Sequence, residues 1–187
     1  MQKNDNSFLS PQELALMPFK YIGEHVLVSR KASFYNIGEI SLGNHVRIDD
    51  FCILSGSITL GNHIHISAHC ALYGTMGIEM EDFSGLSPGC KVFSITDDFS
   101  GEHMVGPMVP EALTRVSGGR VVIGKFVQVG AGCTIFPSTK IGEGAAVGAM
   151  SLVNRSLSPW GIYAGIPVKR IGDRSKNIIE LAKKIKS

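Results

Sequence analysis

The 187-residue sequence predicts an all-β solenoid, because large apolar residues recur every six positions over most of its length. Gly or another small residue usually follows the apolar one, as in Leu42-Gly43 and Ile123-Gly124. A period of six fits neither an α-helix nor simple strand alternation, so each hexad is expected to form one short strand and one corner. The hexads are guided by Ile22, Val28, Phe34, Leu42, Ile48, Leu54, Leu60, Ile66, Leu72, Met80, Leu86, Val92, Ile123, Val129, Ile135, Ile141, Val147 and Val153.

Grouping the hexads in threes predicts six turns of a triangular coil. The departures from a step of six all follow a third hexad, where Phe34 to Leu42 and Leu72 to Met80 are each two residues too long. The long excursion between Val92 and Ile123 leaves the coil from the same hexad. Insertions confined to one corner support the grouping.

The four cysteines give a second test of the grouping. Each lies four residues after the guide residue of a middle hexad, in four successive turns. We therefore expect them to form one inward-pointing column, with neighbours about 4.8 Å apart as in any strand ladder. They are expected to be small buried thiols, with no disulfide framework and no zinc-binding CxxC pair. The four are Cys52, Cys70, Cys90 and Cys133.

Both ends of the chain are predicted to be helical. Ser10, Pro11 and Glu13 form a helix start with a capping box, in a helix that runs to about Met17. An amphipathic helix is expected at the C-terminus, with lysines opposite its apolar stripe. The chain is expected to be a single domain, 1–187, made of an N-terminal helical segment 1–20, a coil 21–158 with a loop 97–121, a closing turn 159–172 and a C-terminal helix 173–187.

Composition excludes several classes of protein. The apolar content of 44% suits a filled core, and a net charge of +2 is too small to indicate nucleic-acid binding. No run of eighteen apolar residues predicts a membrane span, and the first ten residues lack the apolar core of a secretory signal. A cytoplasmic location is therefore expected.

The hexads, the single large loop and the closing segment Tyr163–Ile171 together resemble the hexapeptide-repeat acyltransferases. Within them, the galactoside, maltose and xenobiotic acetyltransferase branch is most similar, especially the sugar acetyltransferases of bacterial surface-polysaccharide biosynthesis. The resemblance implies a left-handed parallel β-helix and a homotrimer with acetyl-CoA sites between subunits. It further implies acetyl transfer to a sugar hydroxyl or amino-sugar nitrogen, in a free, nucleotide-linked or lipid-linked acceptor, with no metal cofactor.

Trimer formation also has a physical rationale. Flat outer faces that expose Phe126 and Val121-Val122 would gain by packing against copies of the chain, and cyclic closure avoids open filaments.

The same resemblance assigns a coenzyme site. The pantetheine arm of acetyl-CoA is expected to follow the groove between coils, where small residues allow close approach. Lys169 and Arg170, with Arg174 as a further candidate, stand where cations meet the coenzyme phosphates. The remaining contacts implied are Gln128, Ala131, Ala149, Asn154 and Ala164.

The catalytic base stays open among three readings. Asp98 occupies the position where the galactoside branch has histidine, so Asp98 itself is one candidate, as base or as ligand of the acceptor. His103 is a second, oriented by Asp97 or Asp98. Acetyl transfer needs a base for the acceptor's proton. His65, the third candidate, is slightly preferred to His103, because residues on the coil are rigidly placed.

Further residues are expected to bind the acceptor. His69 lies near the position of a substrate-binding Asn in the galactoside branch, and Asp97 is a candidate ligand or orienting group. Arg115, in the long loop, suits an anionic acceptor such as a nucleotide-linked sugar. No cysteine is placed to act as a nucleophile, so direct attack in a ternary complex is predicted.

Two alternatives remain open at this stage. His63, His65 and His69 raise the possibility of a zinc enzyme of the gamma carbonic anhydrase type, although their spacing does not match that family. A catalytically inactive β-helix scaffold would explain the aspartate at position 98.

Overall fold

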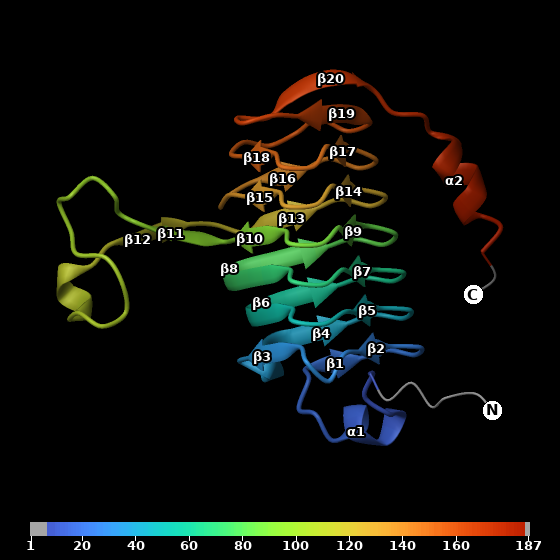
Figure 1. Cartoon of the computed structure of the whole chain (residues 1–187), viewed down its shortest axis with the longest axis horizontal. Coiled ribbons are helices and arrows are strands. Elements are labelled where there is room, and N and C mark those ends of the chain that lie inside the picture. Colours follow the sequence, from blue (N-terminus) through green and yellow to red (C-terminus); the bar gives the residue numbers. More distant parts are fainter. Residues whose placement is uncertain (1–6, 186–187) are drawn as a thin grey trace.

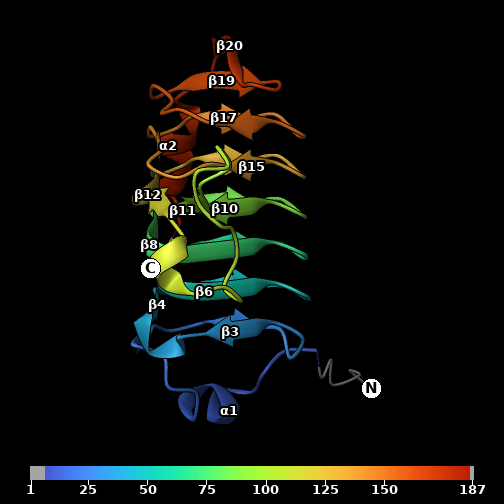
Figure 2. The ribbon, with the colours of Figure 1, turned by 90° about the vertical axis from the view of Figure 1, so that its left-hand side faces the viewer.

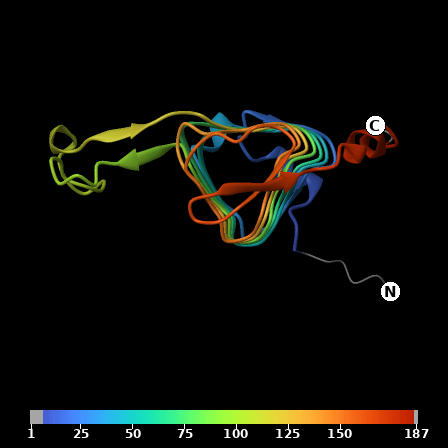
Figure 3. The same ribbon diagram turned by 90° about the horizontal axis from the view of Figure 1, so that it is seen from above.

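The computed structural model describes residues 7–185, and over them the chain winds into a triangular coil. Figure 3 looks down the coil, whose three flat faces appear edge-on as the sides of a triangle, and Figure 2 shows the turns stacked above one another. All strand pairs between turns are parallel until the last one. The predicted all-β solenoid is confirmed.

Each face collects one strand from every turn (Figure 1). The first face holds β1 (Tyr21–Ile22), β4 (Ile40–Leu42), the second half of β6 (Ile53–Leu60) and of β8 (Ala71–Met80), β13 (Val121–Ile123) and β16 (Lys140–Ile141). The second holds β2 (Leu27–Val28), β5 (Arg47–Ile48), β7 (His65–Ile66), β9 (Gly85–Leu86), β14 (Gln128–Val129), β17 (Ala146–Val147) and β19 (Gly161–Ala164). The third holds β3 (Ser33–Tyr35), the first halves of β6 and β8, β10 (Lys91–Phe93), β15 (Thr134–Ile135) and β18 (Leu152–Val153).

The core follows directly from the repeat. Parallel pairing in register places Ile48, Ile66 and Leu86 above one another, and all three are buried. Equivalent positions of successive hexads therefore stack into columns that fill the interior. The predicted inward cysteine column is confirmed, since the four cysteines follow guide residues that pair in register and are all fully buried.

The coil has one turn more than the six predicted. Leu157 bridges to Ile141, Tyr163 pairs with Val147, and the Val168 N–H donates to the Leu152 carbonyl at 3.0 Å. These three residues are buried like the earlier guide residues. Tyr163 follows Leu157 by six positions, but an aromatic guide residue and a five-residue step to Val168 disguised the repeat. β20 (Lys169–Asp173) then folds back antiparallel on β19 and ends the coil.

The terminal helices are shorter than predicted. α1 (Pro11–Ala15) begins with the expected capping box but stops two residues before Met17. α2 (Asn177–Ala182) does not start at position 173, because Asp173 is still paired in β20. The predicted segments at 1–6 and 186–187 lie outside the described residues. No helix within 7–185 is long and apolar enough to cross a membrane.

The excursion is a structured arm rather than an irregular loop from 97 to 121. β11 (Ile95–Asp97) and β12 (Val116–Gly118) pair antiparallel at its base, and a 3-10 helix (Glu111–Leu113) lies beyond them. Figures 1 and 3 show this arm, residues 95–118, projecting sideways from the coil. A second short 3-10 helix (Ile37–Glu39) takes up the extra residues of the first turn, as the grouping predicted.

Of the three apolar residues expected on an outer face, only Val122 is partly exposed. Val121 and Phe126, expected on an outer face, are only 0% and 4% exposed, because Val121 points into the core and Phe126 packs between other rings. Large exposed apolar side chains include several on the arm, where Phe99 is 80% and Met108 is 94% exposed, and others at the end of α1, on the coil and near its C-terminal end.

Candidate active site

The base of the arm gathers acidic and basic side chains around one hollow. It has a volume of about 490 Å³, and its lining includes four residues predicted from the sequence. These are Asp97, Asp98, His103 and Arg115. The antiparallel pairing of β11 with β12 brings them together, because Asp97 ends the outgoing strand and Arg115 precedes the returning one. The structure thus places these four predicted residues around a common space.

Within this hollow, Asp98 holds His103. Asp98 Oδ2 lies 2.7 Å from His103 Nδ1, and Oδ1 accepts the Ser100 backbone N–H at 2.8 Å. Hydrogen bonds from Ser100, followed by that from His103, lower the pKa of Asp98 to about 2. A carboxylate with so low a pKa is a poor proton acceptor near neutral pH, but it is well suited to orient a histidine ring. The geometry therefore favours an orienting role for Asp98.

Aromatic rings line the neighbouring hollows on either side of β11. One hollow, about 260 Å³, is lined by Phe93, Ile95, Thr96, Asp97, Phe99, Phe136 and Pro137. The other includes Tyr73, which stacks on Phe93 with ring centroids 5.3 Å apart. Sequence reasoning missed these rings, although Tyr73, Phe93 and Phe136 each directly follow the guide residue of a third hexad. Asp97 thus stands between apolar walls.

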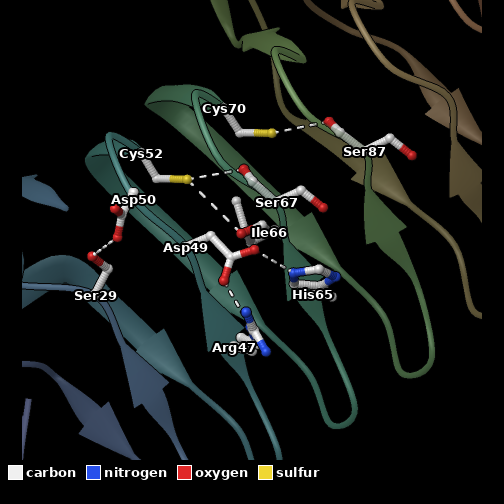
Figure 4. Close-up of polar contacts among 10 residues, drawn as sticks. All are labelled: Ser29, Arg47, Asp49, Asp50, Cys52, His65, Ile66, Ser67, Cys70 and Ser87. Atoms are coloured by element: carbon white, nitrogen blue, oxygen red, sulfur yellow. Dashed lines mark hydrogen bonds and ion pairs between the residues drawn. The ribbon is translucent and has the colours of Figure 1, made fainter. Parts of the chain in front are cut away.

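His65 lies on the second face and does not line the hollow around Asp97. Its Nε2 is 2.8 Å from Asp49 Oδ2, while Arg47 Nε donates to Asp49 Oδ1 at 2.7 Å (Figure 4). Burial opposes ionisation of Asp49, but the hydrogen bonds from Arg47 and His65 prevail and lower its pKa. The exposed imidazole is therefore held by a carboxylate, an arrangement that a histidine base uses.

The other two histidines of the candidate zinc triad sit at different corners. His69 stacks on Phe51, with ring centroids 5.0 Å apart. His63 belongs to an aromatic stack at the first corner, made of His25, His45, His63, Phe83, Phe126 and Trp160. Among residues 7–185 no group of three His, Cys, Asp or Glu side chains is arranged to hold a metal ion.

The predicted coenzyme residues follow the later turns of the coil. Gln128 is exposed on β14 and donates from Nε2 to the Phe83 carbonyl at 3.2 Å. Ala131 and Ala149 lie at the second corner of successive turns, joined by a bond from Met150 N–H to the Ala131 carbonyl. A Cβ on Gly130 would come within 2.5 Å of the Ala149 nitrogen, so only glycine allows these turns to approach so closely.

The predicted coenzyme contacts near the end of the coil differ in their exposure and hydrogen bonding. Asn154, Lys169 and Arg170 are exposed, and Arg170 forms an ion pair with Asp173. Ala164 pairs with Lys169 across the β19–β20 turn. Arg174 differs from the others, because one of its guanidinium nitrogens donates to the carbonyls of Phe126, Gly144 and Ala145.

The Arg174 side chain is thereby bonded to the backbone of the coil. Its partial burial also lowers its pKa. Instead of standing free for a phosphate, its side chain anchors the segment that leads to α2.

Comparison with known proteins identifies the family of the chain. No family model matches the chain. A dTDP-4-amino-4,6-dideoxy-D-glucose acyltransferase from Escherichia coli is 38% identical over 178 residues, covering 94% of this chain and 93% of that protein. The chain belongs to the hexapeptide-repeat acyltransferases.

Solved structures agree with this assignment. A serine-to-cysteine variant of AntD, an N-acyltransferase from Bacillus cereus, in complex with dTDP-4-amino-4,6-dideoxyglucose and coenzyme A, superposes with a TM-score of 0.94. The two sequences are 49% identical, over 97% of each chain. A complex of AntD with dTDP and 3-hydroxybutyryl-CoA is 50% identical with a TM-score of 0.93, over 96% of each chain. The predictions of the family, of a parallel β-helix and of an acyltransferase are therefore confirmed.

Proposed function

We propose that this hexapeptide-repeat acyltransferase transfers an acetyl group from acetyl-CoA to the amino nitrogen of a dTDP-linked 4-amino-4,6-dideoxy sugar. The carrying observation is the near full-length similarity to two proteins described as acting on or binding that sugar. It favours N- over O-acylation and a nucleotide-linked over a free or lipid-linked acceptor. Both co-substrates belong to the cytoplasm, which is the location we propose.

The AntD variants direct attention to two residues. They substitute one serine and one aspartate that lie ten positions apart in that protein. In this chain, the only serine followed by an aspartate ten positions later is Ser87, with Asp97. Ser87 directly follows guide residue Leu86 at the second corner, and Asp97 lies in the hollow described above. We infer that these two residues serve acyl transfer here.

Their chemistry suits the reaction. Asp97 can accept a hydrogen bond from the acceptor's amino group and so hold it for attack. As the nitrogen bonds to the thioester carbon, negative charge grows on the carbonyl oxygen, where the Ser87 hydroxyl can donate. The C–S bond then breaks, coenzyme A leaves as thiolate, and the proton lost by nitrogen ends on that sulfur directly or through a base. His65, held by Asp49, and His103, held by Asp98, are the two candidate bases.

The binding contacts remain those that the sequence suggested. Arg115, beside Asp97, offers a guanidinium to the anionic nucleotide, and His69 is the proposed acceptor contact at the second corner. The coenzyme would follow the second corner of the later turns and reach the exposed cations of β20. The proposed contacts are Gln128, Ala131, Ala149, Asn154, Ala164, Lys169 and Arg170.

We also propose that the enzyme is a homotrimer with its sites between subunits. Ser87 precedes β10 and Asp97 follows it, so they lie beyond opposite ends of that strand, and Ser87 does not line the hollows around Asp97. Two groups that serve one reaction would meet if the Ser87 corner of one subunit faced the arm of the next. The exposed Phe99 and Met108 give the arm apolar surface for such a contact.

The test is an assay of free thiol release from acetyl-CoA with dTDP-4-amino-4,6-dideoxyglucose as acceptor. Ser87→Ala and Asp97→Asn are each expected to lower kcat about 100-fold. Ser67→Ala, at the same corner one turn earlier, and Glu111→Gln, elsewhere on the arm, are the matched controls and should keep wild-type rates. Thiol release with sugars that lack the amino group would contradict the proposal, and so would unchanged rates in Ser87→Ala and Asp97→Asn. Absence of acetyl-CoA binding by calorimetry would instead favour the scaffold alternative.

A further inference from the structure

The buried thiols of the cysteine column share one hydrogen-bonding pattern that the acyltransfer chemistry does not explain. Each thiol donates to a corner carbonyl of the following turn, as Figure 4 shows for the first two. The Sγ to oxygen distances are 3.1 Å from Cys52 to Ser67, 3.2 Å from Cys70 to Ser87, 3.1 Å from Cys90 to Gly130 and 3.1 Å from Cys133 to Gly148. The column is thus a ladder of donors directed at one corner.

The Ser87 carbonyl has the Cys70 thiol as its donor. Among residues 7–185 no backbone N–H donates to the Ser87 carbonyl, whereas the Leu86 carbonyl before it and the Pro88 carbonyl after it accept from Ser67 and Gly132. Cys70 itself is fully buried, and its bond to the Ser87 carbonyl is partly buried. The thiol thus supplies, on the inner side of the corner, a donor that the backbone does not provide.

A hydroxyl at the column position of a later turn also donates to a corner carbonyl, but to that of its own turn, which accepts from Cys133 as well. Ser151 stands four residues after guide residue Val147, where the four turns before it have cysteine. Its Oγ donates to the Gly148 carbonyl at 2.7 Å. The column position therefore accommodates a hydroxyl as well as a thiol, while in the first turn it holds Ala32, which has no side-chain donor.

We propose that Cys70 is a positioning residue for acyl transfer, holding the corner backbone so that the Ser87 hydroxyl stays directed at the thioester oxygen. The proposal rests on the proposed function of Ser87. Of the four thiols, only that of Cys70 bonds to Ser87. Displacements of about 1 Å at a reacting group can lower a rate about 100-fold, so one hydrogen bond at this corner matters.

Cys70 does not act as a nucleophile in this scheme. Its thiol is fully buried, and its neighbours Cys52 and Cys90, together with burial, raise its pKa far above the usual range. A thiol that stays protonated can donate a hydrogen bond but cannot attack a thioester. Its role is confined to the backbone it holds.

The experiment compares Cys70→Ala, Cys70→Ser and Cys52→Ala in the full chain. Cys52→Ala is the matched control, because it removes the same kind of bond one turn away, to Ser67 instead of Ser87. We expect Cys70→Ala to lower kcat about 10- to 100-fold with KM changed less than about twofold. Cys70→Ser should stay within about threefold of the wild-type kcat, since a hydroxyl is at least as good a donor.

Hydrogen exchange provides a readout that does not depend on activity. Cys70→Ala should speed amide exchange in residues 87–90 relative to Cys52→Ala, and Cys70→Ser should restore protection. Equal kcat values in Cys70→Ala and Cys52→Ala, or equal exchange at this corner, would overturn the proposal. If Ser87→Ala kept the wild-type kcat, the proposed function of Ser87 would fail instead, and with it the positioning role of Cys70.

Discussion

Glu13 joins the first helix to the first turn of the coil through a set of short hydrogen bonds. Its Oε2 accepts the Ser10 backbone N–H at 2.8 Å, and both carboxylate oxygens receive the Arg30 guanidinium at 2.7 and 2.6 Å. The hydrogen bonds from Arg30, and after them those from Ser10, lower the pKa of Glu13 to about 2. The capping box was evident in the sequence, whereas the partnership with Arg30 exists only because β2 returns beside α1.

This pKa predicts a pH dependence of stability. The ordinary pKa is 4.5, so the stabilisation by the Glu13 carboxylate is fully present above pH 4.5 and is lost as the pH falls toward 2. Glu13→Gln should lower the Tm by about 2 °C at pH 7, since the pair is exposed and a domain of this size shifts only a few degrees. The difference in Tm between wild type and variant should shrink from pH 4.5 to pH 2. A difference that is constant over this range in thermal melts would contradict the assignment.

Among the elements, the aromatic stack links the turns of the coil along the first corner. Neighbouring rings lie 4.6 to 4.7 Å apart from His25 through His63 to Phe83, and each stacked residue has a positive φ. Side-chain amides and a carboxylate run beside it, with Asn44, Asn62 and Asp82 each accepting a backbone N–H of the preceding turn. Equal offsets in successive turns convert a sequence repeat into a continuous packed column.

One histidine of the stack should make stability sensitive to pH. Burial, followed by repulsion from His45 and opposed by Asp82, lowers the pKa of His63 below 6.5. The unfolded chain therefore binds more protons, so stability falls as the pH drops below about 6.5 and levels off once it is below the folded pKa. His63→Phe should weaken this dependence and keep the ring, since Phe83 adopts the same φ in the next turn. Urea denaturation at pH 7.5 and 5.5 measures this pH dependence of the free energy of unfolding. His25→Phe, at the end of the stack, is the control and should retain the wild-type dependence.

On the scale of the whole molecule, the coil and the arm differ in how they bury apolar side chains. The coil buries its guide residues in continuous columns, while the arm projects from one corner with large apolar side chains in contact with solvent (Figure 3). Exposure of this kind marks an interaction surface more often than chance. In the proposed trimer, the neighbouring subunit covers it.

The trimer proposal predicts a measurable mass. Light scattering of the purified protein should give three times the 20.1 kDa of the chain. The double substitution Phe99→Glu and Met108→Glu places charge in the contact and should shift the mass toward that of the monomer and lower the activity at least tenfold, about the effect of losing one positioned group. Leu16→Glu, which is 85% exposed at the other end of the molecule, should leave the mass unchanged. A trimer that persists in the double variant would show that the arm does not carry the contact.

Residue spacing explains which parts of the fold were predictable. The period of six set the faces, the corners and the inward column of Cys52, Cys70, Cys90 and Cys133, because parallel strands in register stack equal offsets. The last turn was missed where the step from Tyr163 to Val168 shortens to five. The arm's hairpin was missed because short antiparallel strands give a weak signal among Gly and Pro residues.

The candidate site was predictable only in part. By itself, the sequence determined the coil, the family and the acidic residues Asp97 and Asp98 at the point where the chain leaves the coil, since repeat and order are properties of the chain. Only the tertiary structure decided that Asp98 holds His103, that His65 pairs with Asp49, and that Arg174 is bonded to the coil. Such contacts depend on where the turns and the arm bring distant side chains together, and a hydrogen bond requires a distance that no spacing along the chain specifies.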